Sequence, residues 1–122
     1  MKVAGIGFRA EATIASLRAA LTGAGGSGGV TALATSDAKA GAAVMLAFAA
    51  ELGVPVLAIS AADLSAQTTL TNSARVREKT GAGSLAEAAA LAATGSDARL
   101  SGPRAVSPDH MATAAIATGP FQ

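Results

Sequence analysis

Residues 2–8 read KVAGIGF and residues 11–21 read EATIASLRAAL, and these two stretches decide the fold class. The first is a short apolar run, which is typical of a buried strand. In the second, Ile14, Leu17 and Leu21 recur at the spacing of one face of an α-helix. The chain is therefore predicted to open with a strand, a tight turn and a helix.

The same order continues further along the chain. Residues 31–35 (TALAT) predict a second strand, and residues 54–59 (VPVLAI) predict a third. Between them, the buried stripe of a second helix is formed by Val44, Met45, Phe48 and Leu52. Gly53 and Pro55 are the usual stop signals of such a helix. Strands that alternate with helices indicate βαβ units and a largely parallel sheet covered on both faces.

The rest of the chain completes a single domain of residues 1–122, because this length leaves no room for a second core. Ser84-x-x-Glu87 resembles a capping box, so a helix is expected to begin there. In the tail, residues 98–106 and 112–118 predict a hairpin-like pair of strands. The expected fold class is α/β: a three-layer α/β/α arrangement around a mostly parallel sheet of about five strands, with an antiparallel strand at the C-terminal edge.

A glycine-rich stretch separates the first helix from the second strand. Residues 23–29 read GAGGSGG. Glycine loses more backbone entropy on folding than any other residue, so we expect a flexible connection without a regular element. The stretch lacks the Gly-Lys-Ser/Thr of a phosphate-binding Walker loop, which also favours a linker.

Composition excludes several classes of function. Hydrophobic residues make up 51% and charged residues 14% of the 122 residues, so the chain is too apolar to be disordered. A net charge of +1 and 2% aromatic residues provide neither the basic field nor the stacking platforms that nucleic-acid binding uses. The longest apolar run is too short to cross a membrane, and the N-terminus does not resemble a signal peptide. We therefore expect a cytoplasmic protein that binds neither nucleic acid nor membrane.

Metal and thiol chemistry are also not expected. The chain has no cysteine and one histidine, His110, which excludes disulfides, thiolate sites and sites with several histidines. His110 and Met111 precede the last expected strand and are interpreted as loop residues. We expect no metal and no cofactor.

Polar residues follow the expected parallel strands at their carboxyl ends. Open parallel sheets bind ligands there, because the loops meet helix N-termini with free amides. The candidate ligand-binding residues after the first two strands are Gly7, Arg9, Thr35, Ser36, Asp37 and Lys39. If these strands are neighbours, Arg9 and Lys39 lie at one edge and can hold an anionic ligand.

The pattern Gly5-x-Gly7-x-x-Ala10 also matches a loose dinucleotide-binding motif. A full dinucleotide fold needs two mononucleotide-binding halves, and this chain has room for about one. We therefore favour a tight turn between strand and helix as the reason for the glycines.

Four further candidates for ligand binding lie in the second half of the chain: Asn72, Ser73, Gly81 and Ser84. Ser73, beside Asn72, could bind an anion at a short helix start or act only as a cap. The amides around Gly81 and Ser84 could cradle a carboxylate or serve only the turn. Asp37 and Ser73 are weak candidates for catalysis, since an acid or base needs geometry as well as residue type.

Five blocks of the sequence resemble a known family. They are GIGFR (5–9), ALATSDAKA (32–40), ELGVPVLAISAADL (51–64), TNSARV (71–76) and TGAGSLAEAAAL (80–91). In this order they are similar to CobE and the C-terminal domain of CbiG, a family of cobalamin biosynthesis. The resemblance implies a three-layer α/β/α fold and a role in making the corrin ring, whose intermediates are cyclic tetrapyrroles with many carboxylates.

Departures from the family pattern limit what the resemblance implies. Phe8 and Ala10 stand where the family's first block often has a cysteine and a second arginine, so thiol chemistry is excluded there and the positive charge is reduced. CbiG-like proteins combine this domain with others in an enzyme that opens a ring lactone. Those partner domains are not expected in this chain, so that hydrolase activity is not assigned to it.

The residues and the resemblance leave three hypotheses open. In the first, the protein binds or carries an anionic precorrin or other corrinoid intermediate through Arg9 and Lys39. In the second, it is an enzyme acting on a precorrin lactone or ring substituent, as in CbiG-like hydrolases, with Asp37 or Ser73 in proton transfer. In the third, it is an interaction subunit for other enzymes of the cobalamin pathway.

Overall fold

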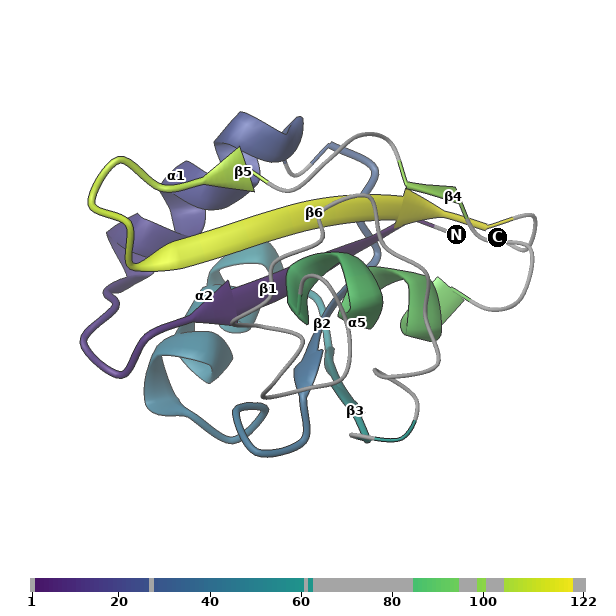
Figure 1. Ribbon diagram of the computed structural model, residues 1–122, viewed down its shortest axis with the longest axis horizontal. Helices are drawn as coiled ribbons and strands as arrows, with labels where there is room; N and C mark the ends of the chain where they lie inside the picture. Colours follow the sequence, from purple (N-terminus) through teal and green to yellow (C-terminus); the bar gives the residue numbers. More distant parts are fainter. Residues whose placement is uncertain are drawn as a thin grey trace.

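The computed structural model describes residues 2–26, 28–60, 62, 85–94, 99–100 and 105–119 (Figure 1). Along the chain the elements are β1 (Lys2–Phe8), α1 (Ile14–Ala24), β2 (Ala32–Ser36), α2 (Ala43–Leu52), β3 (Val56–Ile59), α5 (Leu85–Thr94), β4 (Arg99–Leu100), β5 (Ala105–Val106) and β6 (Ala112–Thr118). The predicted alternation of strands and helices is confirmed. The expected cap at Ser84 lies outside the described residues, but α5 begins one residue after it. In the part of the chain that is described, no helix has the length and apolarity to cross a bilayer.

The strands form one sheet in the order β3-β2-β1-β6-β4, and β5 also pairs with β6. β1 and β2 are parallel, as are β2 and β3, whereas β6 runs antiparallel to β1 along all seven residues of both strands. The α/β fold class with an antiparallel C-terminal strand is thus confirmed. β6 itself lies one place inside the edge, because the short strands β4 and β5 pair with its outer side.

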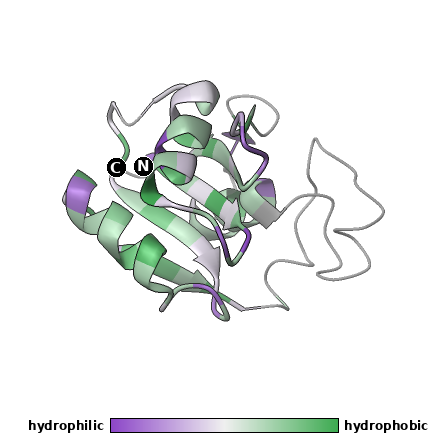
Figure 2. Cartoon of the chain, turned by 90° about the vertical axis from the view of Figure 1, so that its left-hand side faces the viewer, coloured by the Kyte–Doolittle hydropathy of each residue, from purple (hydrophilic) through white to green (hydrophobic). Residues whose placement is uncertain are grey.

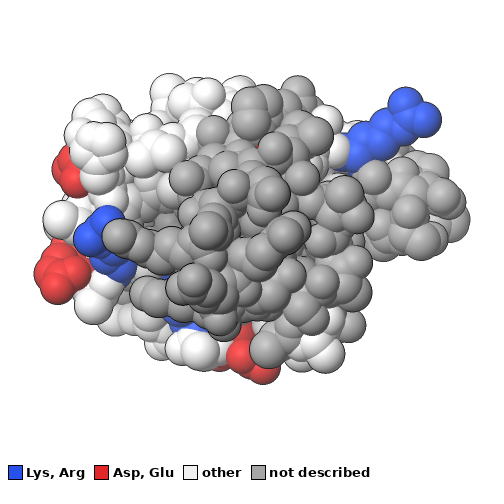
Figure 3. Space-filling view, in the orientation of Figure 1, with Lys and Arg blue, Asp and Glu red and all other residues white. Residues whose placement is uncertain are grey.

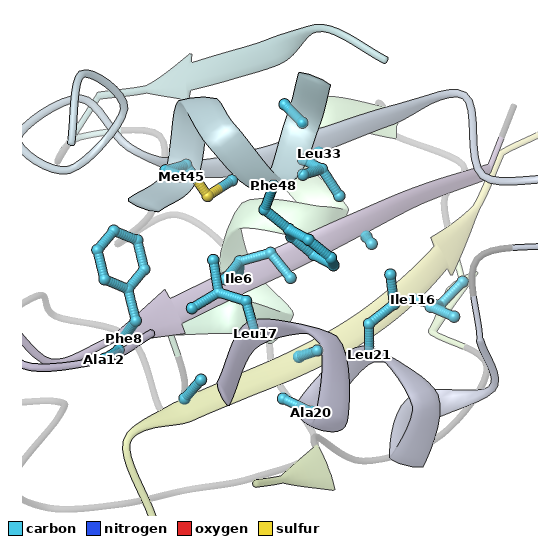
Figure 4. Close-up of a cluster of buried hydrophobic side chains, with 14 residues drawn as sticks. Ile6, Phe8, Ala12, Leu17, Ala20, Leu21, Leu33, Met45, Phe48 and Ile116 are labelled. Atoms are coloured by element: carbon cyan, nitrogen blue, oxygen red, sulfur yellow. The ribbon is translucent and has the colours of Figure 1, made fainter. Parts of the chain in front are cut away.

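The larger of the buried clusters fills the space between the sheet and the helices α1 and α2. In Figure 1 these helices lie behind the sheet and α5 lies in front of it. Figure 4 shows Phe48 of α2 and Leu17 of α1 pointing toward Ile6 of β1, and all three are fully buried. Alternate residues of β1 belong to this cluster, as the two-residue period of a strand requires. Figure 2 shows that the strands and helices are mostly hydrophobic (green), whereas hydrophilic residues (purple) are concentrated in several loops.

The other face of the sheet is covered by α5, which approaches β1 very closely. The helix presents alanines to the sheet, and Ala86 and Ala90 are fully buried. A Cβ atom at Gly5 would overlap the carbonyl oxygen of Ala86 and lie 2.7 Å from the amide nitrogen of Ala90. Gly5 and Gly7 both lie inside β1. The expected tight turn between strand and helix follows at residues 9–12, so the prediction that these glycines form it is wrong. Gly5 is needed because the backbone of α5 occupies the space of a side chain.

The glycine-rich stretch departs from its predicted structure at its start. Gly23 and Ala24 form the last turn of α1, which ends at Gly25 with a φ of 133°. A Cβ atom at Gly23 would lie 3.1 Å from the Cβ of Ala105 in β5. The helix thus continues into the stretch because it packs against β5, where a glycine allows close approach. Ser27 lies outside the described residues.

A cluster of hydrogen bonds attaches the loop between β5 and β6 to the start of α1. Thr13 caps α1 and forms a capping box with Ser16. The Ser16 hydroxyl donates to Asp109 Oδ2 (2.6 Å), and Asp109 Oδ1 accepts from the Ser107 hydroxyl (2.5 Å) and the Met111 N–H (3.0 Å). We call these four residues, Ser16, Ser107, Asp109 and Met111, the Asp109 clasp. The hydrogen bonds of the clasp lower the pKa of Asp109 to about 2. The hydrogen bond from Ser107 contributes most to this shift, and that from Ser16 is next.

Replacement of Gly5 by alanine should destabilise the protein. The new methyl group has to displace the backbone of α5, and overpacking of this kind typically costs about 1–3 kcal/mol. The measurement is the free energy of unfolding from urea denaturation. Gly41→Ala is the matched control, because a Cβ there meets nothing within 4 Å, and it should stay within about 0.5 kcal/mol of the parent. Equal stability of the two variants would contradict the close helix–strand contact.

The Asp109 clasp should make stability depend on pH in the acid range. A carboxyl group whose folded-state pKa is lowered stabilises the fold above its unfolded value, 3.8, and loses this contribution as the pH falls toward about 2. Asp109→Asn should therefore have a lower melting temperature than the parent at pH 5 to 7, and the difference should shrink below pH 4. Other carboxyl groups titrate in both proteins and cancel in the comparison. A constant difference down to pH 2 would show that the carboxylate charge is not involved.

Candidate ligand-binding site

The ends of four strands meet at one edge of the sheet. β1, β2 and β3 are parallel and end there at Phe8, Ser36 and Ile59, and the antiparallel β6 begins there, with Ala112 opposite Phe8. We call this the carboxyl edge. In Figure 1 it includes the left-hand end of β1, and Figure 2 views the molecule from that side. The loops that start from these strand ends carry the candidates from the first half of the chain.

Lys39 lies in the turn after β2 and reaches across to β1. Its Nζ donates to the carbonyl oxygen of Phe8 (2.7 Å) and lies 4.8 Å from the centre of the Phe8 ring. The side chain is half-buried, and an ammonium over an aromatic face is attracted by the ring quadrupole. An ammonium has three N–H donors, and within the described residues only the Phe8 carbonyl accepts from this one. Lys39 is therefore held in place with donors left for a ligand.

Arg9 follows Phe8 directly and is exposed. Its backbone N–H donates to the carbonyl oxygen of Met111 (2.9 Å), and its own carbonyl accepts from the N–H of Ala12 (3.0 Å). The side chain forms no ion pair within the described part of the chain. The fold thus brings Arg9 and Lys39 to the same edge, where both adjoin Phe8, and Arg9 is exposed to solvent.

The remaining candidates of the first two strands differ in their accessibility. Asp37 is exposed and its N–H donates to the Ile59 carbonyl (2.9 Å), whereas Ser36 is half-buried and its carbonyl closes the turn that carries Lys39. Thr35 is fully buried, and its hydroxyl donates to the Ile6 carbonyl (2.7 Å). Gly7 is buried within β1, where its carbonyl accepts from the Thr113 hydroxyl at 3.4 Å. Thr35 and Gly7 thus form hydrogen bonds between neighbouring strands. The candidates that reach the surface of the edge are Ser36, Asp37, Lys39 and Arg9.

The charge at this edge is mixed. Glu11 and Asp37 are exposed, and each lies two residues from one of the cations along the chain. Figure 3 shows blue and red side chains side by side on the left of the molecule. The carboxylate of Asp109 uses both oxygens within the clasp. Among the described residues there is no group of three His, Cys, Asp or Glu side chains that could bind a metal ion. The arrangement suits carboxylate groups that meet individual cations rather than an anion drawn by a broad positive field.

The other candidates, Asn72, Ser73, Gly81 and Ser84, lie outside the described residues. Two residues that shape the edge are not among those predicted from the sequence: Phe8, the partner of Lys39, and Asp109, the centre of the clasp. For Asp109 a local signal exists, because Ser107-Pro108-Asp109 is typical of a turn in which side chains accept from nearby backbone amides.

Comparison with known proteins agrees with this architecture. A family model described as "Cobalamin synthesis G C-terminus" matches residues 2–117. The crystal structure of CobE, a protein from the cobalamin (vitamin B12) biosynthetic pathway, superposes with a TM-score of 0.83 and 33% identity, over 96% of this chain and 89% of that one. The cobalamin biosynthesis protein chiG from Agrobacterium tumefaciens str. C58 gives a TM-score of 0.73 and 36% identity, over 99% and 100%. No curated protein matches the chain. Since the family model spans nearly all of the chain, the protein belongs to the family of the cobalamin synthesis G C-terminus and acts in cobalamin biosynthesis.

Proposed function

We propose that this protein binds an anionic precorrin or other corrinoid intermediate at the carboxyl edge and carries it between enzymes of the pathway. The observation that supports this most is the placement of two cations around one strand end. Lys39 Nζ lies 2.7 Å from the carbonyl oxygen of Phe8, and Arg9 is the next residue. Membership in a cobalamin-biosynthesis family makes a tetrapyrrole the fitting ligand class.

The chemistry of the edge fits such a ligand. Intermediates of corrin-ring synthesis carry several carboxylates around a macrocycle. An arginine guanidinium binds a carboxylate through two parallel hydrogen bonds, and a lysine ammonium binds one as a compact charge. Arg9 and Lys39 can therefore hold two different carboxylates of one ligand.

Lys39 is preorganised for this role. An exposed lysine loses rotamer freedom when it binds, which weakens the net interaction. The contacts of Lys39 with the Phe8 carbonyl and ring already restrict its side chain before a ligand arrives. Part of the ordering that binding requires is thus present in the folded protein.

Titration of the protein with hydrogenobyrinic acid, followed by absorbance, tests the proposal. The spectrum of the ligand should shift on mixing, and the mass of the ligand should stay unchanged. Arg9→Ala and Lys39→Ala should each weaken binding tenfold or more, because a hydrogen bond to a charged group contributes about 1.5–3 kcal/mol. Arg99→Ala and Lys2→Ala are matched controls that remove the same charges at the opposite end of the sheet, where Arg99 and Lys2 both lie opposite Thr118. These controls should bind like the parent.

Each outcome of the titration has a distinct meaning. Unchanged affinity in both Arg9→Ala and Lys39→Ala rejects the carboxyl edge as the site. Equal losses in the controls indicate a general effect of net charge. A change in the mass of the ligand identifies an enzyme instead of a carrier, and binding of pathway enzymes without any tetrapyrrole binding identifies an interaction subunit.

A further inference from the structure

We propose that Asp109 is a positioning residue for Arg9, so that the loop between β5 and β6 sets the geometry of the binding site. This inference rests on the proposed function, since it concerns how the site is held ready for its ligand. Asp109 itself need not touch the ligand. It acts through the turn of residues 9–12, which carries Arg9 from the end of β1 to the start of α1.

The first end of that turn is attached to the clasp through Met111. The N–H of Arg9 donates to the carbonyl oxygen of Met111 (2.9 Å), and the N–H of Met111 donates to Asp109 Oδ1 (3.0 Å). The Ser107 hydroxyl donates to the same carboxylate oxygen and accepts from the N–H of Ala112 (3.0 Å). The backbone of Arg9 is therefore two hydrogen bonds away from the Asp109 carboxylate.

The second end of the turn is attached through the cap of α1. The Ser16 hydroxyl donates to Asp109 Oδ2 (2.6 Å) and accepts from the N–H of Thr13 (3.2 Å). Thr13 is the N-cap that directly follows the turn, and Ser16 is 2% exposed. Within the turn, the N–H of Ala12 donates to the carbonyl of Arg9 (3.0 Å). Both ends of the segment of residues 9–12 are thus connected by hydrogen bonds to the Asp109 carboxylate.

This arrangement fixes the backbone of Arg9 while its side chain stays exposed. If a cation lies on a loop that is hydrogen-bonded at one end only, the loop has to be ordered when the ligand binds, and the entropy lost in that ordering reduces affinity. The clasp orders the backbone of Arg9 before the ligand binds, so less entropy is lost on binding. The carboxylate of Asp109 is compensated by three donors within the clasp, so its charge is largely satisfied there rather than by Arg9.

A positioning role and a purely electrostatic role predict opposite results for Asp109→Ala. Removal of a negative charge near an anion site should tighten anion binding if only charge matters. Loss of the clasp should instead weaken binding of hydrogenobyrinic acid, by about threefold to tenfold. Glu51→Ala is the matched control, because it removes the same charge and breaks another attachment of α1, the ion pair with Arg18 (2.6 Å). It should leave the affinity within twofold of the parent.

A double-mutant cycle tests whether Asp109 acts through Arg9. If it does, Asp109→Ala should weaken binding in the parent but change it less than twofold in the Arg9→Ala protein. Ser16→Ala, which changes no charge, should follow the same pattern, and it replaces Asp109→Ala if circular dichroism shows that variant to be unfolded. Asp109→Asn should lie between the parent and Asp109→Ala, since it keeps one acceptor for Met111.

The cycle separates failure of this inference from failure of the proposed function. Tighter or unchanged binding by the clasp variants, or an equal loss in the Arg9→Ala background, overturns the positioning role while the site remains. If Arg9→Ala and Lys39→Ala both bind like the parent, the carboxyl edge is not the site, and the proposed function and this inference fail together.

Discussion

The contact between α5 and β1 at Gly5 is the constraint on which the rest of the sheet depends. A side chain at this position would occupy the space of the Ala86 carbonyl, so the helix backbone lies directly on the strand. Four alanines of α5 are fully buried: Ala86, Ala88, Ala89 and Ala90. Because α5 covers one face of β1 this closely, the large side chains of the core gather on the other face, where Ile6, Leu17 and Phe48 meet. The uneven division of a core poor in aromatic residues follows from this one contact.

The position of β1 in turn assembles the candidate site. The strand pairs with β2 on one side and with β6 on the other. The turn after β2 therefore reaches Phe8 from one side through Lys39, and the loop before β6 reaches Arg9 from the other through Met111. Three segments that are far apart in the sequence contribute to a single edge. The order of the strands, more than any local motif, brings these groups together.

Local patterns predicted most of the elements but not the contacts between distant ones. The helical spacing of Ile14, Leu17 and Leu21 depends only on nearby residues, so α1 and the strand before it could be predicted. The role of Gly5 depends on α5, and the clasp joins Ser16 to a residue 93 positions later, so neither has a periodic signal. Thr35 precedes the loop after β2, but the alternation of side chains along a strand places it on the same face as Leu33, where it is buried and bonds to the carbonyl of Ile6. The prediction of a common edge for Arg9 and Lys39 needed only the assumption that β1 and β2 are neighbours, and they are.

The weak net charge explains why fixed geometry matters at this edge. With a net charge of +1 and the exposed acids Glu11 and Asp37 nearby, the protein has no long-range field that would draw in an acidic macrocycle. On the proposed function, selectivity then has to come from contacts at short range. Lys39 Nζ is held by β1 and the backbone of Arg9 by the loop before β6, so the pairing of β1 with its two neighbours limits how far apart the two cations can lie. On the proposed function, a ligand with two carboxylates at that spacing contacts both cations, whereas a simple anion contacts one. Once the first carboxylate is bound, binding of the second is effectively intramolecular. On the proposed function, a fixed lysine ammonium and an arginine with a fixed backbone distinguish a polycarboxylate from the many small anions around it.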